Sequence, residues 1–222
     1  MTIDFSKRVI NILISFVLLI ITLPLMFVLL LISFWILGEI PIYKQKRWIT
    51  LSKEKITIYK IRTISKEQLL KINRSKAKHI FLKNDPRIKI DRYSQWLRKT
   101  HLDELPQLFN VLIGKMNLVG LRPLNEKDLK YMKKNYPKEY NLRDSFSSNI
   151  GITGTWQLYG EKNISSLINC DYHYENNKSL MYDLSLLING NYLKKLFVHS
   201  KVFFTPDSKS VSERKPKVDL NL

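Results

Sequence analysis

The stretch "VINILISFVLLIITLPLMFVLLLISFWIL", residues 9–37, runs from end to end without a charged side chain. A helix needs about 20 apolar residues to cross the hydrocarbon core of a bilayer, and this stretch is longer. It therefore predicts a membrane segment. A cleaved signal peptide is excluded, because its apolar region is only about 7–15 residues long and ends at a small-residue cleavage site, which this segment lacks.

Pro24 stands near the middle of this segment. Proline removes a backbone donor and clashes with the preceding turn, so we expect the helix to kink or break at residues 22–24. Two topologies follow: a kinked helix that crosses the membrane, or a re-entrant helix of two arms that leaves on the side it entered. A broken backbone needs polar partners at membrane depth, and the Thr22 hydroxyl is one candidate.

Basic residues flank the segment on both sides. Lys7 and Arg8 precede it, and the basic residues that follow it are Lys44, Lys46, Arg47, Lys53, Lys55 and Lys60. Positive flanks favour the cytoplasmic side of a membrane. Both ends of the segment are therefore expected there, which favours the re-entrant topology over the spanning one.

The whole chain carries a net charge of +18. This excess predicts adhesion to anionic membrane lipid and, second, binding of a phosphorylated substrate. No nucleic-acid partner is expected, because the chain has a membrane segment and no nucleic-acid motif. The 4 histidines are scattered, and the single cysteine, Cys170, can form no internal disulfide and has no metal-ligand spacing around it.

The predicted fold class is mainly α with a short β hairpin (α+β), with amphipathic interfacial helices. We expect a membrane helix at 1–40, a membrane-surface catalytic domain at 41–205 and a polar disordered tail at 206–222. We expect a strand at 55–64 and a glycine-punctuated loop at 150–160. Helices are expected at 66–83, 92–99, 105–113, 126–140 and 179–204, and the last of these is divided in two at 189–190. The helix at 92–99 interleaves aromatic and basic side chains, so it lies either flat in the membrane interface or in the core with a solvated basic face.

Asp103 and Glu104 stand just before the apolar helix at 105–113. The simplest interpretation is a helix N-cap at Asp103 with Glu104 in the first turn. Adjacent residues on a helix point about 100° apart, which excludes a paired acid/base site of the glycosidase kind. A carboxylate at a helix N-terminus can instead attack phosphorus while its neighbour binds a hard cation. Such chemistry needs arginines to neutralise phosphate charge, and Arg98 and Arg122 stand in the neighbouring motifs.

Four motifs carry a family resemblance. They are "YKIRT" (59–63), "DPRI" (85–88), "LRKTHLDELPQLFNVLIGKMNLVGLRPL" (97–124) and "GITGTWQ" (151–157). In this order the chain resembles the bacterial sugar transferases of the polyprenyl-phosphate phosphoglycosyl transferase superfamily, the small monotopic type. The resemblance covers about residues 5–190, and its central block is long and specific.

The resemblance implies transfer of a sugar-1-phosphate from a nucleotide diphosphate sugar, usually a UDP-sugar, to undecaprenyl phosphate, with release of UMP. It implies that Asp103 is the covalent nucleophile, that Glu104 is its partner and that Mg²⁺ sits at this dyad. The substrate-binding residues implied by the matching motifs are Arg98, Arg122, Lys60, Arg62, Gln45 and Arg47. Thr153 and Gln157, in the glycine-rich loop, are further candidates for contact with uridine.

The same resemblance implies a re-entrant helix broken at Pro24. It places the protein in the bacterial inner (cytoplasmic) membrane, with the catalytic domain on the cytoplasmic face. The implied partners are the UDP-sugar donor, the undecaprenyl phosphate acceptor and the glycosyltransferases that act downstream.

Several of these residues also have a purely structural interpretation. Lys60 and Arg62 lie two apart on the expected strand and could form a solvated face. Trp156 could simply pack in the core, which is the commoner role of a tryptophan. Asp85 and Arg87 could stabilise a turn at the intervening proline.

The sequence departs from the family pattern at four positions. Leu23 replaces the serine that often precedes the membrane proline, Asn117 replaces a serine, and Leu121 and Ile150 replace prolines. The last three motivate an alternative, a catalytically inactive membrane scaffold of a glycan assembly complex. Retention of the charged motif residues argues against it. Among donor sugars, diacetylated bacillosamine, N-acetylgalactosamine, galactose and glucose remain open.

Overall fold

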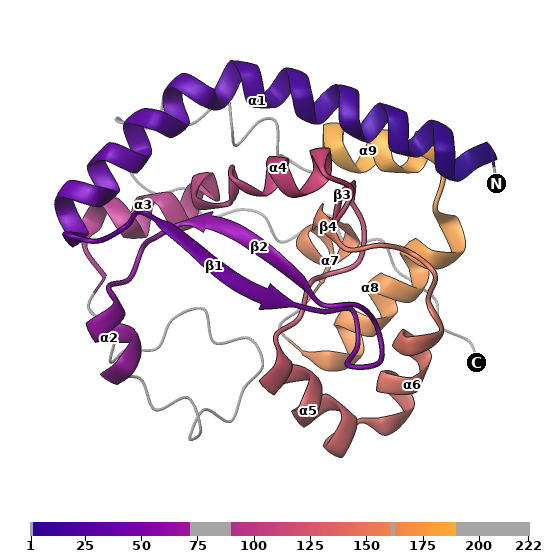
Figure 1. Ribbon diagram of the computed structural model, residues 1–222. Coiled ribbons are helices and arrows are strands. Elements are labelled where there is room, and N and C mark those ends of the chain that lie inside the picture. Colours follow the sequence, from indigo (N-terminus) through magenta and orange to yellow (C-terminus); the bar gives the residue numbers. More distant parts are fainter. Residues whose placement is uncertain (1, 72–89, 161–162, 190–222) are drawn as a thin grey trace, which may run out of the picture.

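The protein is described by a computed structural model that covers residues 2–71, 90–160 and 163–189. Its elements, shown in Figure 1, are α1 (Thr2–Leu37), β1 (Ile42–Arg47), β2 (Ile56–Ile61), α2 (Lys66–Lys71), α3 (Arg92–Thr100), the 3₁₀ helix η2 (Leu102–Glu104), α4 (Gln107–Leu112), β3 (Asn117–Val119), α5 (Glu126–Asn135), α6 (Pro137–Ser145), β4 (Gly151–Thr153), α7 (Thr155–Leu158), α8 (Ile164–Asn177) and α9 (Leu180–Asn189). The expected class, mainly α with a short antiparallel β hairpin, is confirmed.

Some expected features lie outside the described residues. They are the second part of the helix at 66–83, the turn with Asp85 and Arg87, the second helix of 179–204 and the tail at 206–222.

The long apolar segment forms one helix, α1, of 36 residues. Of the kink or break expected at residues 22–24, the structure shows no break: α1 continues through Pro24, and Figure 1 shows the helix bending over the rest of the molecule. A helix can continue because proline removes only one main-chain hydrogen bond, at the cost of a bend. The Thr22 hydroxyl donates to the Leu18 carbonyl at 2.7 Å. It therefore does not replace the donor that Pro24 lacks.

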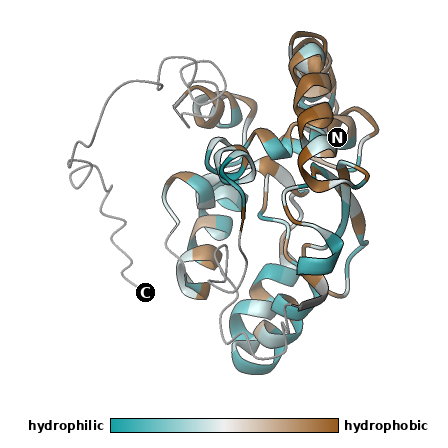
Figure 2. Ribbon diagram, turned by 90° about the vertical axis from the view of Figure 1, so that its left-hand side faces the viewer, coloured by the Kyte–Doolittle hydropathy of each residue, from teal (hydrophilic) through white to brown (hydrophobic). Residues whose placement is uncertain are grey.

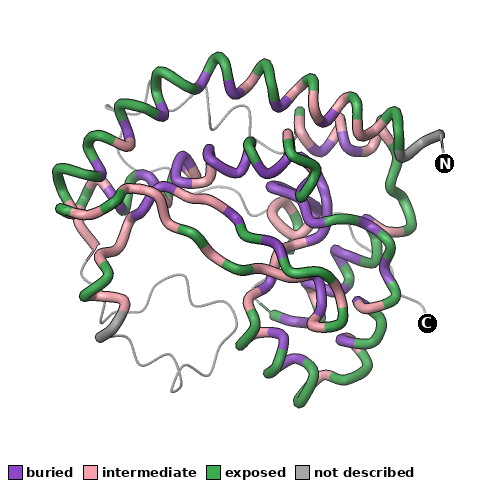
Figure 3. Tube along the Cα trace, in the orientation of Figure 1, coloured by how far each residue is buried: buried purple, intermediate pink, exposed green. Residues whose placement is uncertain are grey.

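One narrow stripe of α1 faces the domain. The buried residues recur every three or four positions, as the inward face of a helix requires (Figure 3). They are Asn11, Ser15, Leu19, Thr22, Met26, Leu29 and Ser33. The stripe is unusual because more than half of its members are polar.

The opposite face of α1 is apolar and exposed. Phe5–Leu37 is long and apolar enough to cross a membrane, and outward side chains such as Phe16, Phe27 and Trp35 are 53%, 61% and 81% exposed. Figure 2 shows α1 as a largely hydrophobic helix at one end of the molecule, while the opposite end is mainly hydrophilic. An apolar outward face of this length suits contact with lipid rather than water.

Both halves of α1 are tied to the same domain. Near its start, the Arg8 guanidinium donates to the last carbonyls of α4, those of Val111 and Leu112, at 2.6 and 2.8 Å. Near its end, the Tyr93 hydroxyl of α3 donates to the Leu29 carbonyl at 2.6 Å. The helix therefore lies along the domain instead of leaving it.

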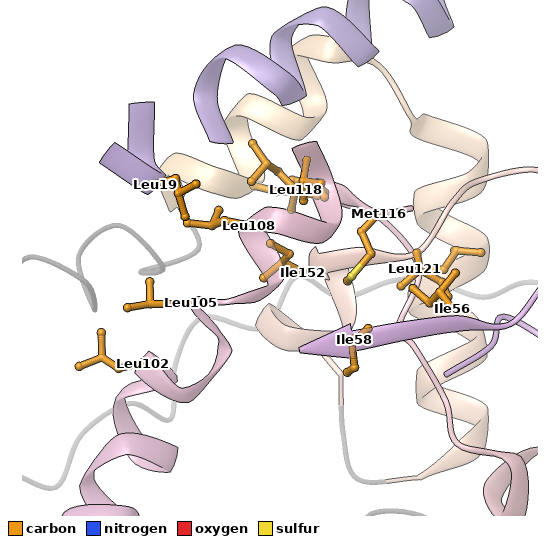
Figure 4. Packing of buried hydrophobic residues seen from close by; sticks show 14 of the residues in the cluster. Leu19, Ile56, Ile58, Leu102, Leu105, Leu108, Met116, Leu118, Leu121 and Ile152 are labelled. Atoms are coloured by element: carbon orange, nitrogen blue, oxygen red, sulfur yellow. The ribbon is translucent and has the colours of Figure 1, made fainter. Parts of the chain in front are cut away.

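Two short sheets and two hydrophobic clusters complete the fold. β1 and β2 form the antiparallel hairpin, and β3 pairs in parallel with β4. β3 and β4 approach so closely beside Gly120 and Gly151 that a Cβ on Gly151 would lie 2.1 Å from the nitrogen of Gly120. The larger cluster joins α1, β2, η2, α4, β3 and β4 (Figure 4), and the smaller one joins α5, α6 and α8.

The apolar helix expected at 105–113 is shorter in the structure, where α4 covers only Gln107–Leu112. Pro106 is the N-cap of α4, so Asp103 lies in η2 and is not the N-cap that we expected. Gly114 follows the helix with a φ of +85°, a left-handed conformation that glycine adopts most easily.

Three further differences concern the C-terminal half. Pro137 begins α6 and divides the helix expected at 126–140, because a proline suits the first turn of a helix and not its interior. The loop expected at 150–160 contains β4 and α7, and α8 was not predicted. Close glycine packing and tertiary contacts decide these elements, and periodicity does not reveal them.

Replacing Asn11 with leucine is expected to destabilise the fold by about 1–3 kcal/mol. Oδ1 of Asn11 accepts from the buried N–H of Leu118 at 2.7 Å, and leucine would leave that donor without an acceptor. The measurement is the Tm of the detergent-solubilised protein, followed through alkylation of its only cysteine, Cys170. Burial raises the pKa of the Cys170 thiol to about 11, so the folded protein protects it from alkylation.

The matched control is Leu13→Ala, since Leu13 is 58% exposed on the outward face of α1. It should leave the Tm close to that of the wild type. An Asn11→Leu protein with an unchanged Tm would contradict the proposed anchoring of α1 to β3.

Candidate active site

The carboxylates of Asp103 and Glu104 lie in η2, between α3 and α4. The turn begins at His101, whose φ of 60° is uncommon for a residue other than glycine. Such strained positions cluster at functional sites. Asp103 is only 9% exposed, and the Glu104 carboxylate forms an ion pair with the Lys60 ammonium at 2.6 Å. The turn therefore presents two adjacent carboxylates, one of them closely paired with a cation.

Asn110 aligns Lys60 with this turn. Its Nδ2 donates to the Thr57 carbonyl at 2.7 Å, and its Oδ1 accepts from the N–H of Tyr59 at 3.3 Å. These bonds fix α4 against β2 beside Lys60, which reaches Glu104 as a result. Sequence reasoning missed Asn110, although a buried amide within an apolar helical pattern was an available signal.

Arg122 approaches the dyad from the segment after β3. Its guanidinium lies over the ring of Trp156, 4.3 Å from the ring centre. Burial lowers the pKa of Arg122 and nearby Arg47 lowers it further, whereas Glu104 and Asp171 raise it. These charges show that Arg122 lies within electrostatic range of the dyad and of a second arginine.

A buried ion pair supports the segment that carries Arg122. Arg143 in α6 and Asp171 in α8 form this pair with both side chains 0% exposed. Arg143 also donates to the carbonyl of Arg122 and, through Nε, to that of Ile49 at 2.9 Å. Burial raises the pKa of Asp171 to about 6 and lowers that of Arg143, so lost hydration outweighs their attraction. Sequence reasoning missed both residues, since nothing local distinguishes them.

Gln45 and Arg47 project from the same side of β1, as residues two apart on a strand do. The Arg47 guanidinium donates to Oε1 of Gln45 at 2.7 Å and to the Pro123 carbonyl at 3.4 Å. The structure therefore brings this predicted pair together with the segment of Arg122.

Arg62 lies elsewhere. Its Nε donates to the Ile40 carbonyl at 2.9 Å, and its guanidinium stands 3.6 Å from the Glu39 carboxylate and 5.5 Å from the ring centre of Tyr43. These contacts fix the chain where it leaves α1. A substrate contact of Arg62 stays a prediction.

Three polar atoms in or beside the predicted set are buried and, within the described residues, make no hydrogen bond. They are Nη1 of Arg98, Nε1 of Trp156 and Oε1 of Gln157. Buried polar atoms almost always have a partner in proteins or in ordered water. These atoms therefore offer two donors and an acceptor to a polar ligand.

Thr153 faces a different environment. It is 3% exposed in β4, where its carbonyl accepts from the N–H of Gly120 at 3.0 Å. Its side chain lines an apolar cavity beneath α1. Its contact with uridine stays a prediction.

The dyad is the candidate metal site. In the part of the chain that the structure describes, no three His, Cys, Asp or Glu side chains gather closely enough to hold an ion. Mg²⁺ is usually held by one or two carboxylates, with water and substrate phosphates filling the other positions. The carboxylates of Asp103 and Glu104 fit that mode of binding.

Known proteins are similar to this chain in sequence. A family model described as bacterial sugar transferase matches residues 2–194. An undecaprenyl-phosphate galactose phosphotransferase of Salmonella typhimurium is 34% identical over 82% of this chain and 39% of its own length. A UDP-galactose-lipid carrier transferase of Erwinia amylovora and an uncharacterized sugar transferase of Haemophilus influenzae are 42% and 44% identical, each over 48% of this chain and 21% of its own length. The chain thus spans less than half the length of these relatives.

Replacing Arg143 with methionine is expected to destabilise the protein by about 3–5 kcal/mol, because the Asp171 carboxylate would remain buried and unpaired. The double variant Arg143→Met/Asp171→Leu should recover part of that loss. The measurement is the Tm from Cys170 alkylation.

Arg92→Met is the control, since Arg92 is exposed at the start of α3. Equal destabilisation by the Arg92 and Arg143 substitutions would show that the buried pair has no special role.

Proposed function

Because the chain belongs to the bacterial sugar transferase family, we propose that it transfers a sugar-1-phosphate from a UDP-sugar to undecaprenyl phosphate, releases UMP and performs the first membrane step of polysaccharide or glycoconjugate synthesis. The observation that carries the proposal is the strained turn that presents Asp103 beside the Lys60–Glu104 ion pair, with Arg122 within electrostatic range of Glu104. Two relatives, an undecaprenyl-phosphate galactose phosphotransferase and a UDP-galactose-lipid carrier transferase, support it by the activities in their names.

The proposed reaction has two displacements at one phosphorus. An oxygen of the Asp103 carboxylate attacks the sugar-bearing phosphorus, and the bond from that phosphorus to the bridging oxygen breaks, so UMP leaves with that oxygen. A phosphate oxygen of undecaprenyl phosphate then attacks the same phosphorus. The bond to Asp103 breaks, which restores the carboxylate and yields the lipid-linked diphosphosugar.

Cationic side chains around the dyad stabilise the phosphoryl oxygens during both displacements. Arg122 is held flat on Trp156, and its main chain is fixed by Arg143. Arg98 brings a guanidinium nitrogen that has no hydrogen-bond partner among the described residues. Lys60 orients Glu104 through their ion pair. Arg47 donates to the Pro123 carbonyl beside Arg122, and Gln45 orients Arg47 by accepting a hydrogen bond from it.

Mg²⁺ is the proposed cofactor, with Asp103 and Glu104 as its protein ligands. When bound there, it supplies positive charge that offsets the charge on the transferring phosphoryl group.

The proposed setting is the cytoplasmic face of the bacterial inner membrane. A re-entrant α1 that is bent and not broken is supported by its contacts at Arg8 and Leu29, since both parts of the helix are bonded to the same domain. Its exposed apolar face meets lipid, and the basic surface meets anionic headgroups. This placement holds the dyad where a soluble donor and a membrane-bound acceptor can both reach it. Glycosyltransferases that extend the product are the proposed downstream partners.

The scaffold alternative gains no support from the positions that depart from the family pattern. Leu121 and Ile150, which replace two prolines, bridge one another and are 0% and 1% exposed. The N–H of Leu121 donates to the Asn149 carbonyl at 3.0 Å, a bond that proline could not make. Asn117 pairs with Gly151 in the neighbouring ladder. These substitutions therefore alter core packing and remove no charged group of the site.

Asp103→Asn is expected to lower UMP release about 1,000-fold or more, because an amide is a poor nucleophile. The assay combines detergent-purified protein, Mg²⁺, undecaprenyl phosphate and a panel of UDP-sugars. Without acceptor, the wild type should release about one equivalent of UMP and gain the mass of a phosphosugar on the peptide containing Asp103. The variant should do neither.

Asp128→Asn in α5 is the matched control and should retain activity. A fully active Asp103→Asn protein would refute the covalent mechanism, and a folded wild type that is inactive with every donor would favour the scaffold.

Removal of divalent ions with EDTA should reduce UMP release about 100-fold or more, since metal polarisation contributes several kcal/mol to such reactions. Added Mg²⁺ should restore it. As an independent readout, electron paramagnetic resonance of added Mn²⁺ should show weaker binding to Glu104→Gln than to Glu126→Gln, an exposed control. Turnover that is unaffected by EDTA would exclude the metal.

A further inference from the structure

An apolar cavity of about 180 Å³ lies beneath α1, between that helix, α4 and α9. Its walls have almost no polar surface. Ile14 and Leu18 contribute from α1, Leu105 from the end of η2, Leu108 from α4, and Leu184 from α9. Figure 1 shows α9 directly below α1, and Figure 4 shows Leu105, Leu108 and Ile152 approaching the same region from the domain.

The cavity adjoins the candidate active site. Leu105, which lines it, directly follows Glu104 of the dyad in the chain. Thr153, which also lines it, is followed by Gly154 and then by Trp156, the residue under Arg122. The segment of Leu105 therefore also carries the dyad, and the segment of Thr153 also carries the ring on which Arg122 lies.

The cavity also adjoins the surface that faces lipid. One wall is α1, whose outward side chains are apolar and exposed. A second wall is α9, where Ile188 lines the cavity and is itself 65% exposed. A hydrophobic chain can therefore pass from lipid to the cavity along apolar surface.

The wall formed by α9 is fixed in place. Asp183 of α9 forms an ion pair with Lys7 of α1 at 2.6 Å and accepts from the Tyr174 hydroxyl at 2.8 Å. Asp183 and Tyr174 are 5% and 1% exposed. A buried charged pair with an added hydrogen bond holds its geometry closely, so the cavity is preformed.

We propose that this cavity binds the isoprene unit next to the phosphate of the polyprenyl phosphate acceptor. The inference rests on the proposed function and adds to it a site for the acceptor chain. An engineered cavity of about 150 Å³ lined by similar side chains binds benzene, so the present cavity suits roughly one branched five-carbon unit. The occupant has an anionic head for the arginines at the dyad and an apolar chain for the hollow. A bulk phospholipid chain has no reason to place its headgroup at the dyad.

Filling the cavity should weaken acceptor binding without affecting the first displacement. Leu184→Phe adds a ring from the α9 wall and is expected to raise the KM for undecaprenyl phosphate about 10-fold or more. The equivalent of UMP released without acceptor should stay unchanged, because none of the residues proposed to bind the donor lies in α9. Both quantities are measured in detergent with Mg²⁺ and the active UDP-sugar.

Met181→Phe is the matched control, since Met181 is on the same helix, is 75% exposed and does not line the cavity. It should change neither quantity. If Cys170 is alkylated rapidly in the Leu184→Phe protein, that variant is unfolded. Ile14→Phe, which fills the same cavity from the α1 wall, then replaces it, and the same two quantities are measured.

An unchanged acceptor KM in a folded cavity-filling variant would overturn the inference. Weaker binding to phosphatidylglycerol vesicles with an unchanged acceptor KM would also overturn it and would assign the cavity to bulk lipid. A folded wild type that releases no UMP from any UDP-sugar would instead refute the proposed function.

Discussion

The docking of α1 through a polar stripe is the constraint on which the rest of the structure depends. Apolar side chains cover the outward face of this helix, so the inward face can be held by directional bonds. Asn11 accepts from the main chain of β3, Arg8 caps the last carbonyls of α4, and Tyr93 of α3 bonds to the helix near its end. α3 and α4 flank the turn that carries the dyad. The position of Asp103 relative to α1 is therefore set by these contacts.

The candidate site draws its charges from distant parts of the chain and fixes each by buried polar contacts. Asn110 holds β2 so that Lys60 meets Glu104, and the pair of Arg143 with Asp171 supports the main chain of Arg122. Buried ion pairs of this kind contribute little net stability, since lost hydration offsets their attraction. Their contribution here is geometric, because the proposed phosphoryl transfer needs cations at defined places.

The sequence predicted the parts of this protein whose signals are local. The apolar length of α1, the alternation of β2 and the motif around Asp103 and Glu104 are readable without coordinates, and the family match agrees with them. The sequence left a kink and a break at Pro24 both open, because the contacts that α1 makes with the domain near each end are not visible in its own residues. Arg143 and Asp171 were missed because their importance arises only when α6 meets α8. Thr153 shows the opposite case, a motif residue whose side chain lies in an apolar cavity.

The inward stripe of α1 also limits how this anchor can be reused. Hydropathy alone would class residues 9–37 as an interchangeable membrane tether. Four of the seven buried stripe residues are polar, however, and two of these, Asn11 and Ser33, form hydrogen bonds with the domain, at Leu118 and Tyr93. Fused to an unrelated cargo, the helix would carry that polar face into lipid without its domain. Polar side chains in lipid form hydrogen bonds across neighbouring helices, so the transplanted helix is expected to associate with its own copies. The segment therefore suits contact with lipid only when this domain covers its polar face.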